Sequence, residues 1–176
     1  TILMQVEPRA TIGAPLREGL KETPERVAKA LMEKLDGYNQ DPAKVLKVFE
    51  DGSDNYDEMV MVRDIEFHSM CEHHMETISG TATIAYVPEK GIVGLSKLAR
   101  LLEVYARRLQ VQERLTTQVT GALDEHLKPK GSACIIEAKH GCMECRGVKK
   151  QNSSTITSSL TGVFKNDPAV RAEFMA

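Results

Sequence analysis

The sequence predicts an α+β fold in which an antiparallel sheet carries two long helices on one face, with a further helix near the N-terminus. Two pairs of strand-type segments, one on each side of a pair of helical segments, support this fold class. The chain has 176 residues, of which 41% are hydrophobic. A chain of this size can form one domain that buries roughly 70% of the surface of its unfolded form. We therefore expect an N-terminal arm at residues 1–19 and a single domain at residues 20–176.

The first predicted element is a helix that begins at Thr23. Threonine is a favourable N-cap residue, and Pro24 suits the first turn of a helix. The apolar stripe of this helix comprises Val27, Leu31 and Leu35. Gly37 is expected to end the helix. Residues 41–57 are polar and rich in turn formers, so no long element is expected there.

Two strands are expected next, at residues 59–67 and 80–87. Valines alternate with other residues at the start of the first strand, although the charged pair Arg63–Asp64 interrupts the alternation. The second strand is rich in threonine, β-branched and aromatic residues, which suit a pleated surface. Pro88 is expected to end it.

The middle of the chain predicts two long helices. Apolar residues recur there at helical spacing after Ser96, a plausible cap, and the two helices are expected to join near Leu109. The two stripes are Leu98, Leu101, Leu102 and Tyr105, and then Leu115, Val119, Ala122 and Leu123. Strands are expected at residues 132–138 and 153–164. Asp167–Pro168 then predicts the start of a short terminal helix.

The composition argues against several classes of function. The formal charge of -2 gives no overall attraction to nucleic acid or to an anionic membrane. No apolar stretch approaches the ~20 residues that cross a bilayer, and no charged-then-apolar leader opens the chain. The four cysteines lie beside metal-type partners and are expected to be reduced thiols in a cytoplasmic protein. With no tryptophan and 5% aromatic residues, a large aromatic platform for a ligand is not expected.

The strongest functional signal is a set of residues that suits a zinc ion. Cys71 and His74 are close enough in the sequence for one turn to direct both at one ion, and Cys142 can supply a third ligand from a distant strand. Three protein ligands leave one position of tetrahedral zinc open, which is the catalytic arrangement. His73 and His140 each lie beside a ligand and are candidates for proton transfer near neutral pH.

A closed structural site is an alternative reading of the same residues. Cys142 and Cys145 form a Cys-x-x-Cys pair, and with Cys71 and His74 they would complete a Cys3His cage that has no open position. Free cysteines are also often small buried apolar residues. The spacing alone leaves the catalytic and the structural reading open.

Charged and polar residues between the metal motifs are candidates for binding an anion or a polar ring. Ser96, Lys97 and Arg100 lie in the first turn of a predicted helix, where hydroxyl, cation and N–H groups can hold phosphate. A solvated helix face is the alternative for these residues. Arg146 follows Cys142 closely, and its guanidinium would suit a bidentate contact with an oxyanion. Gln112–Glu113 could read a polar ring through paired donors and acceptors, or could be an ordinary solvated pair.

Four blocks of this chain together resemble the GTP cyclohydrolase I family. The blocks are Ser69–His74 (SMCEHH), Gly94–Arg100 (GLSKLAR), Arg107–Thr116 (RRLQVQERLT) and His140–Val148 (HGCMECRGV). Their order and spacing agree with the family, and the similarity extends over about residues 18–174. The resemblance favours the catalytic reading of the zinc residues.

The resemblance implies a fold, an assembly and a reaction. The fold is a tunnelling fold (T-fold), and the assembly is a homodecamer of two face-to-face pentamers with active sites at subunit boundaries. The reaction converts GTP and water to formate and 7,8-dihydroneopterin triphosphate, the first step of pterin and folate biosynthesis. The sequence leaves open which pathway uses the product and whether a regulatory partner exists.

The resemblance also implies roles for individual residues, by matching position. It assigns Cys71, His74 and Cys142 as zinc ligands. It assigns His73 and His140 to acid–base catalysis. It assigns Gln112 and Glu113 to recognition of the guanine ring, and Ser96, Lys97, Arg100, Arg146 and Arg26 to the triphosphate.

The chain departs from the family pattern at two places. Residues 75–79 stand where many members have a proline–phenylalanine pair, and Cys145 stands where a small or apolar residue is usual. Three other functions remain as alternatives: a structural zinc module, a nucleic-acid binder, and a T-fold relative that acts on another purine or pterin. The candidate nucleic-acid contacts are Arg107, Arg108 and Arg114. The purine or pterin alternative should lack Glu113, His140 or a triphosphate cation, and none is missing.

Overall fold

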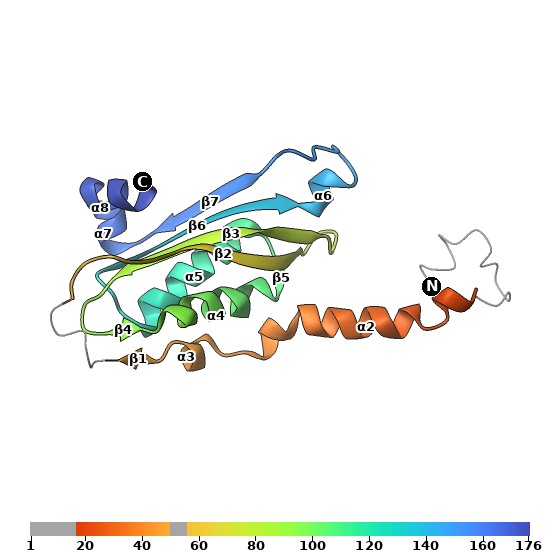
Figure 1. Cartoon of the computed structure of the whole chain (residues 1–176), viewed down its shortest axis with the longest axis horizontal. Helices are drawn as coiled ribbons and strands as arrows, with labels where there is room; N and C mark the ends of the chain where they lie inside the picture. The colour runs from red at the N-terminus through yellow and green to blue at the C-terminus, as the bar shows by residue number, and fades with distance from the viewer. Residues whose placement is uncertain (1–16, 50–55) are drawn as a thin grey trace. The chain divides into compact units, whose positions relative to one another are not determined.

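The computed structural model describes residues 17–49 and 56–176 (Figure 1). These residues fall into two units, one that ends at Lys34 and one that comprises Leu35–Ala176. The predicted arm at residues 1–19 lies almost entirely outside the described residues, so its boundary stays a prediction. No described helix is long and apolar enough to cross a membrane.

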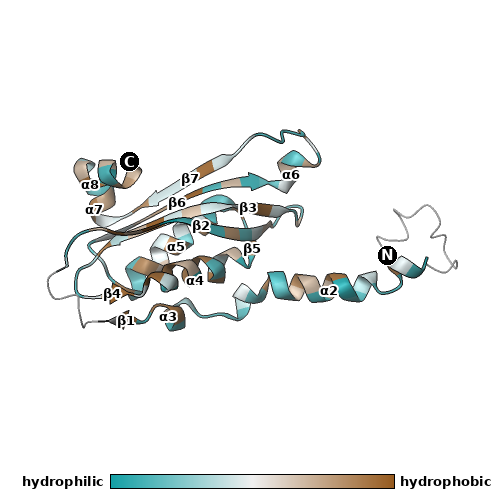
Figure 2. Cartoon of the chain, viewed as in Figure 1, coloured by the Kyte–Doolittle hydropathy of each residue, from teal (hydrophilic) through white to brown (hydrophobic). Residues whose placement is uncertain are grey.

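The N-terminal unit contains the 3-10 turn η1 (Glu18–Leu20) and the helix α2 (Thr23–Lys34). The predicted start of the helix is confirmed, but its predicted end at Gly37 is wrong, because Gly37 lies in the next element, the 3-10 turn η2 (Asp36–Asn39). No residue of α2 is buried. Hydrophobic and hydrophilic residues both lie along its length (Figure 2), and Val27 in the predicted stripe is 50% exposed.

The second unit is built on a five-stranded sheet with the order β5-β2-β3-β6-β7. The strands are β2 (Val60–Cys71), β3 (Thr77–Val87), β5 (Leu109–Gln110), β6 (Gly131–His140) and β7 (Thr155–Leu160). All neighbours are antiparallel except β2 and β5, which are parallel. The four predicted strands are therefore present, with different ends. The strand predicted at residues 153–164 is shorter, because a helix begins at Gly162.

The charged pair Arg63–Asp64 forms a β-bulge in β2. The register with β3 shifts between Val62 and Ile65, and Asp64 has a φ of 55°. Alternation along a regular strand would place residues 62 and 65 on opposite faces of the sheet. Both instead pack against the main core. The bulge thus turns the strand so that the apolar side chains of its second half face the same core as those of its first half.

Two long helices, α4 (Leu95–Ala106) and α5 (Gln112–His126), cover one face of the sheet (Figure 1). The predicted apolar stripes form their buried faces, with Leu98, Leu101, Leu102, Leu115, Val119 and Leu123 all 0% exposed. Ser96 is not the cap of α4. Gly94 occupies the N-cap position, and no side chain caps it. The connection near Leu109 contains the short strand β5, which the sequence did not predict.

A smaller core lies on the opposite face of the sheet. The helices α7 (Gly162–Asn166) and α8 (Pro168–Met175) bring Phe164 and Phe174 together, with ring centroids 5.4 Å apart. These rings pack with residues of β3 and β6 that alternate with those of the main core. The predicted terminal helix is confirmed by α8. Its N-cap is Asp167, whose carboxylate accepts a hydrogen bond from the amide of Ala169 at 2.8 Å.

Short elements complete the second unit. They are α3 (Pro42–Val45), β1 (Val48–Phe49), β4 (Ile92–Val93) and α6 (Gly141–Glu144). β1 and β4 form a separate antiparallel pair. The segment predicted to be turn-rich thus contains one helical turn and one short strand, and its residues 50–55 lie outside the described residues. The predicted fold class, an antiparallel sheet with two long helices on one face, is confirmed.

Candidate metal centre and active site

The candidate site lies where β2 turns into β3. The connection is a tight turn in which the Cys71 amide donates to the carbonyl of Glu76 and the Met75 amide donates to the carbonyl of Cys71, both at 2.8 Å. Met75 adopts the left-handed region with a φ of 56°. The amide of Glu72 also donates to the carbonyl of Gln110 in β5 at 3.0 Å. Hydrogen bonds across the turn and to β5 therefore hold the turn that carries His73 and His74.

Cys142 reaches this turn from β6. The last residue of β6, His140, pairs with Ile78 near the start of β3. The chain then enters α6, where Gly141 lies so close to β3 that an added Cβ would be 3.2 Å from the carbonyl of Thr77. This close approach brings Cys142 beside the β2–β3 turn.

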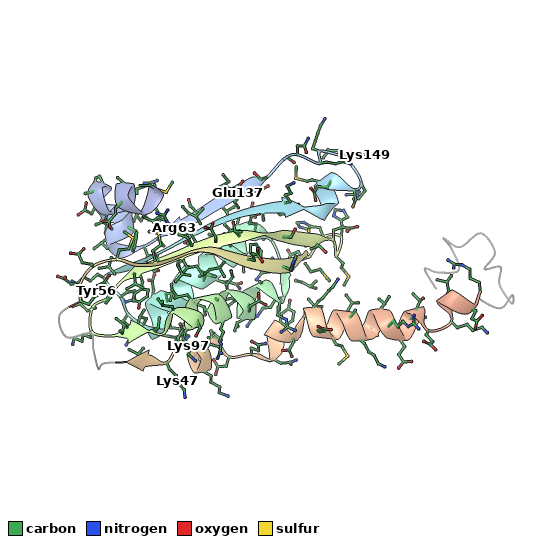
Figure 3. All side chains as sticks on the ribbon, in the orientation of Figure 1. Lys47, Tyr56, Arg63, Lys97, Glu137 and Lys149 are labelled. Carbon is green, nitrogen blue, oxygen red and sulfur yellow. The ribbon has the colours of Figure 1, made fainter. Side chains whose placement is uncertain are left out.

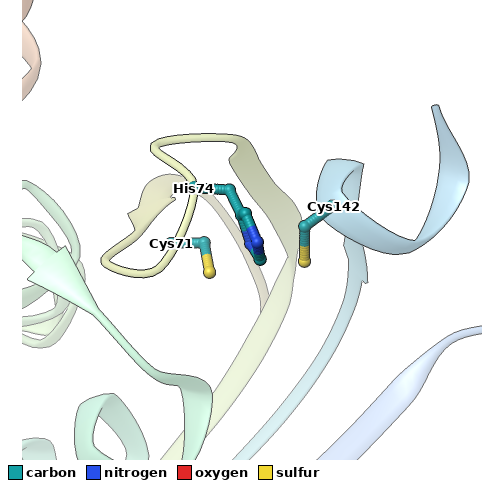
Figure 4. Close-up of side chains that lie close together, drawn as sticks. All are labelled: Cys71, His74 and Cys142. Carbon is teal, nitrogen blue, oxygen red and sulfur yellow. The ribbon is translucent and has the colours of Figure 1, made fainter. Parts of the chain in front are cut away.

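The ligand atoms of Cys71, His74 and Cys142 lie within 4.8 Å of one another, and their side chains point into one space (Figure 4). Cys71 is buried, Cys142 is partly buried and His74 is exposed, so the group is open on the His74 side. Burial and then the neighbouring Cys71 thiol raise the pKa of Cys142. A bound divalent cation would reverse this effect by favouring both thiolates. The donor set and its spacing therefore fit a metal ion.

Cys145 is not part of this group. It is exposed, and its Sγ donates a hydrogen bond to the carbonyl of Gly141 at 2.8 Å. We call Cys71, His74 and Cys142 the metal-type group. Among the described residues, this group contains only the three predicted ligands. This arrangement favours the open site over the closed Cys3His cage.

Of the two candidate proton-transfer residues, His73 lies next to the metal-type group, and His140 lies two residues before the ligand Cys142. The His73 Nδ1 is 3.7 Å from the Cys71 Sγ. The His140 Nε2 is 2.7 Å from the Gln112 Oε1. Burial lowers the pKa of His140, while the carboxylates of Glu113 and Glu144 oppose that shift. Burial thus favours the neutral form of the His140 ring.

The first turn of α5 brings Gln112 and Glu113 to the same end of the sheet. Glu113 is exposed, and its charge acts on His140. Gln112 is 1% exposed, and its amide nitrogen donates to the carbonyls of Ile136 and Thr155 at 3.0 and 2.8 Å. The sequence presented these two residues as a pair, but the structure places Glu113 in solvent and Gln112 in the protein interior.

One predicted triphosphate residue lies at the metal-type group. The Arg146 Nη1 is 3.4 Å from the His74 Nε2, and the guanidinium is exposed. Arg114, considered as a nucleic-acid contact, forms an ion pair with Glu72 in the β2–β3 turn. The sequence does not reveal this pair, because the two residues are distant in the chain and neither belongs to a local pattern.

The other predicted triphosphate residues of the second unit, Ser96, Lys97 and Arg100, lie toward the far end of the sheet. α4 begins directly after Val93, whose amide donates to the Tyr86 hydroxyl at 3.0 Å. Tyr86 is roughly 26 Å along β3 from Ile78, the residue that pairs with His140. Figure 3 agrees, with Lys97 near the start of α4 and Lys149 just beyond α6. One chain therefore does not bring these residues to the metal-type group.

Arg26 belongs to the N-terminal unit, where it lies on α2. Its guanidinium forms an ion pair with Glu22 at 2.5 Å, and both side chains are largely exposed. Its predicted contact with a triphosphate stays a prediction.

The chain is similar to known proteins over most of its length. The family model described as GTP cyclohydrolase I matches residues 9–176. GTP cyclohydrolase 1 of Deinococcus radiodurans is 56% identical over 171 residues, which cover 95% of this chain and 77% of that protein. GTP cyclohydrolase 1 of Chlorobium chlorochromatii is 54% identical over 163 residues, covering 92% and 72% respectively.

A solved structure, the archaeosine synthase QueF-Like in its apo form, matches 59% of this chain and 93% of its own, with 12% identity and a TM-score of 0.48. The family match and the relatives cover far more of the chain. On their evidence the chain belongs to the GTP cyclohydrolase I family.

Proposed function

We propose that this chain is a zinc-dependent GTP cyclohydrolase I, which hydrolyses the guanine imidazole ring of GTP to formate and 7,8-dihydroneopterin triphosphate. As a member of its family the chain is an enzyme, a hydrolase of GTP. The observation that carries the proposal is the convergence of Cys71, His74 and Cys142 with His73 and His140 at one end of the sheet.

Zinc is the metal that suits this donor set best. Thiolate and imidazole bind zinc at about 2.3 and 2.0–2.1 Å, so ligand atoms around one tetrahedral ion lie about 3.5–4 Å apart. The three ligand atoms already lie within 4.8 Å of one another, and small side-chain rotations would close the difference. Zinc bound by three protein ligands supplies an open position for water and lowers the pKa of that water to about 7.

The two histidines would move the protons of the reaction. As the imidazole ring of guanine opens, the nitrogen that leaves the carbon must gain a proton. His140 or His73 would deliver it, because both lie beside the metal ligands. The neutral state of His140 suits a group that first accepts a proton and later returns it.

Glu113 would recognise the guanine ring. Its carboxylate can accept hydrogen bonds from the ring N–H and from the exocyclic amino group, a pair of donors that adenine does not present in the same arrangement. Glu113 is exposed in the first turn of α5, and its charge acts on His140. A base held by this carboxylate would therefore lie next to the proton-transfer group.

The triphosphate would be held by residues from more than one subunit. Arg146 is beside the metal ligands, whereas Ser96, Lys97 and Arg100 lie toward the other end of the sheet of the same chain. A subunit boundary that brings the start of one α4 to the α6 of a neighbour would unite them. Arg26 would join this set from α2.

An oligomer also suits the edges of the sheet. Within the described residues, β7 pairs only with β6, and the outer edge of β2 pairs with β5 only at Met70 and Cys71. Such edges are available for strand pairing between copies. These edges suit an oligomer, and the homodecamer of two pentamers is the assembly that the family resemblance implies. The free thiols suit a cytoplasmic location.

The proposal is tested by incubating the purified protein with GTP and following the absorbance of dihydroneopterin triphosphate, with formate measured in parallel. We expect both products in equal amounts and one zinc ion per subunit by elemental analysis. A structural zinc module would bind the metal but form neither product. A relative acting on another purine or pterin would leave GTP intact, and either result would contradict the proposal.

A further inference from the structure

The side chain of Gln112 connects the start of α5 to the candidate proton-transfer residue His140. The Gln112 Oε1 and the His140 Nε2 are 2.7 Å apart, which is a short hydrogen bond. Gln112 is the first residue of α5 but is only 1% exposed, because it lies in phase with the buried residues Leu115 and Val119. Its amide therefore acts inside the protein.

The surroundings fix which end of the amide faces His140. The nitrogen end of Gln112 donates to the carbonyls of Ile136 and Thr155 at 3.0 and 2.8 Å and to the Thr157 hydroxyl at 3.2 Å. A flipped amide would direct its oxygen at two carbonyl oxygens and leave these groups without a donor, which is costly in a buried site. The oxygen end must therefore point at His140.

A second layer of hydroxyls supports the same orientation. The Thr157 Oγ1 is 2.6 Å from the Thr116 Oγ1, and Thr116 donates to the backbone carbonyl of Gln112 at 2.7 Å. Because Thr116 donates to that carbonyl, Thr157 must donate to Thr116 and accept from the amide. The Gln112 amide thus donates to Thr157, Thr157 donates to Thr116, and Thr116 donates to the Gln112 carbonyl.

We propose that Gln112 is a positioning residue that holds His140 as the tautomer protonated on Nε2. The amide oxygen can only accept, so Nε2 must carry a proton and Nδ1 is the nitrogen left to exchange protons with the substrate. No other hydrogen bond of the His140 ring is present among the described residues. The inference rests on the proposed function, and it gives Gln112 a role other than contact with guanine.

The first test separates positioning from guanine recognition. Gln112→Met keeps the length of the side chain but removes both ends of the amide. We expect kcat to fall about 10–100-fold, as for partners that orient an active-site imidazole, while KM for GTP stays within about twofold. A rise in KM with kcat retained would assign Gln112 to the guanine ring instead. Unchanged kcat and KM would also overturn the inference.

A neighbouring hydroxyl pair provides a matched control. The Thr120 Oγ1 and the Ser159 Oγ are 2.7 Å apart and join the same helix and strand one helical turn further along. This pair has no hydrogen bond to His140. Ser159→Ala should therefore keep kcat, whereas a loss equal to that of Gln112→Met would overturn the inference by showing a general effect of the α5–β7 contacts.

The second test reads the tautomer without turnover. Solid-state ¹⁵N NMR of the zinc-loaded parent, with labelled histidine and His140→Asn to assign the signal, should show the proton on Nε2 above the ordinary imidazole pKa of about 6.5. A proton on Nδ1 would overturn the inference, even if Gln112→Met failed to fold. If the parent formed no product, the proposed function would fail, and the NMR result would still decide the inference. If the parent were active but Gln112→Met matched it, only the inference would fail.

Discussion

Glu72 and Arg114 form an ion pair that joins the β2–β3 turn to the first turn of α5. The turn carries His73 and His74, and the helix turn carries Gln112 and Glu113. The pair therefore connects the metal-type group to the candidate base-recognition residue. Its side chains are 35% and 42% exposed, so water weakens their attraction.

We predict a small effect of this ion pair on stability. A double-mutant cycle with Glu72→Ala and Arg114→Ala should give a coupling energy of about 0–1 kcal/mol, because the pair is partly solvated. The coupling should shrink at high salt. Denaturant unfolding of the four proteins measures it, and a coupling well above this range would show that the pair carries more of the fold than its exposure indicates.

Removal of a metal ligand should remove both zinc and turnover. Cys71→Ser replaces a buried thiol that two other ligand atoms face, so we expect elemental analysis to show loss of most of the zinc. Cys134→Ala is the matched control, because Cys134 is buried in the core and burial raises the pKa of its thiol to about 12. Full zinc and full turnover in Cys71→Ser would remove the metal assignment.

The candidate proton-transfer histidines should affect chemistry more than binding. His140→Ala and His73→Ala should each keep zinc and GTP binding but lose about 100-fold or more in turnover, the usual effect of a positioned acid or base. His126→Ala, in the last turn of α5, is the control and should turn over GTP like the parent. If one of the two site variants matched the parent rate with its zinc intact, that histidine would be structural.

The proposed triphosphate residues should distinguish GTP from guanosine. Replacement of Arg146, Lys97 or Arg100 by alanine should weaken GTP binding more than guanosine binding, because only GTP presents phosphate oxygens to these cations. Titration calorimetry with both ligands measures the difference. Equal losses for GTP and guanosine would mean that these cations are an ordinary solvated surface.

Mixed assemblies provide a further test of the shared site. If Lys97 of one subunit and Arg146 of another serve one GTP, subunits with Lys97→Ala and subunits with Arg146→Ala should restore activity when unfolded and refolded together. Random mixing would regenerate about a quarter of the sites in a symmetric oligomer. No restoration in verified mixed assemblies would place both residues in the same subunit's site.

Cys145→Ala should keep both zinc and turnover. Cys145 bonds to the carbonyl of Gly141 and lies outside the metal-type group, and a fourth thiolate would occupy the position that water needs. The variant should also resist oxidation better, since an exposed thiol beside a metal thiolate can form a disulfide after zinc is lost. Zinc loss in this variant would support the closed structural site.

The sequence predicted elements with strong periodicity and missed features that depend on long-range contacts. The stripes of α4 and α5 are buried as predicted, because their spacing follows the helical period. Gly37 was interpreted as a helix stop. In the structure, this position needs glycine because the backbone of another element packs closely against it. An added Cβ there would lie 2.4 Å from the carbonyl of Val104, and its amide donates to the carbonyl of Arg107 at 3.0 Å. Nothing near Gly37 in the sequence reports that contact.

The residues of the candidate site also differ in how far the sequence predicted their positions. Cys71 and His74 were recognisable because one turn holds both, and Cys142 was proposed as a third ligand from a distant strand. The spacing did not decide between this open set and a cage with Cys145, and the family resemblance favoured the open set. Gln112 was interpreted from its neighbour Glu113 as part of a solvated pair or a ring-binding pair. Its phase with Leu115 was available in the sequence and indicated burial, but its bond to His140 depends on the register between β3 and β6.

In the sequence, Cys71 precedes the two long helices and Cys142 follows them. This order also affects the stability of the protein. An ion held by both thiolates closes a loop of about 70 residues that contains all of α4 and α5. By lowering its entropy, a permanent cross-link over such a loop raises the free energy of the unfolded chain by on the order of 4 kcal/mol. Chelators should therefore make the whole domain more susceptible to heat and proteases, so metal supply would govern how long each molecule survives as well as how fast it works.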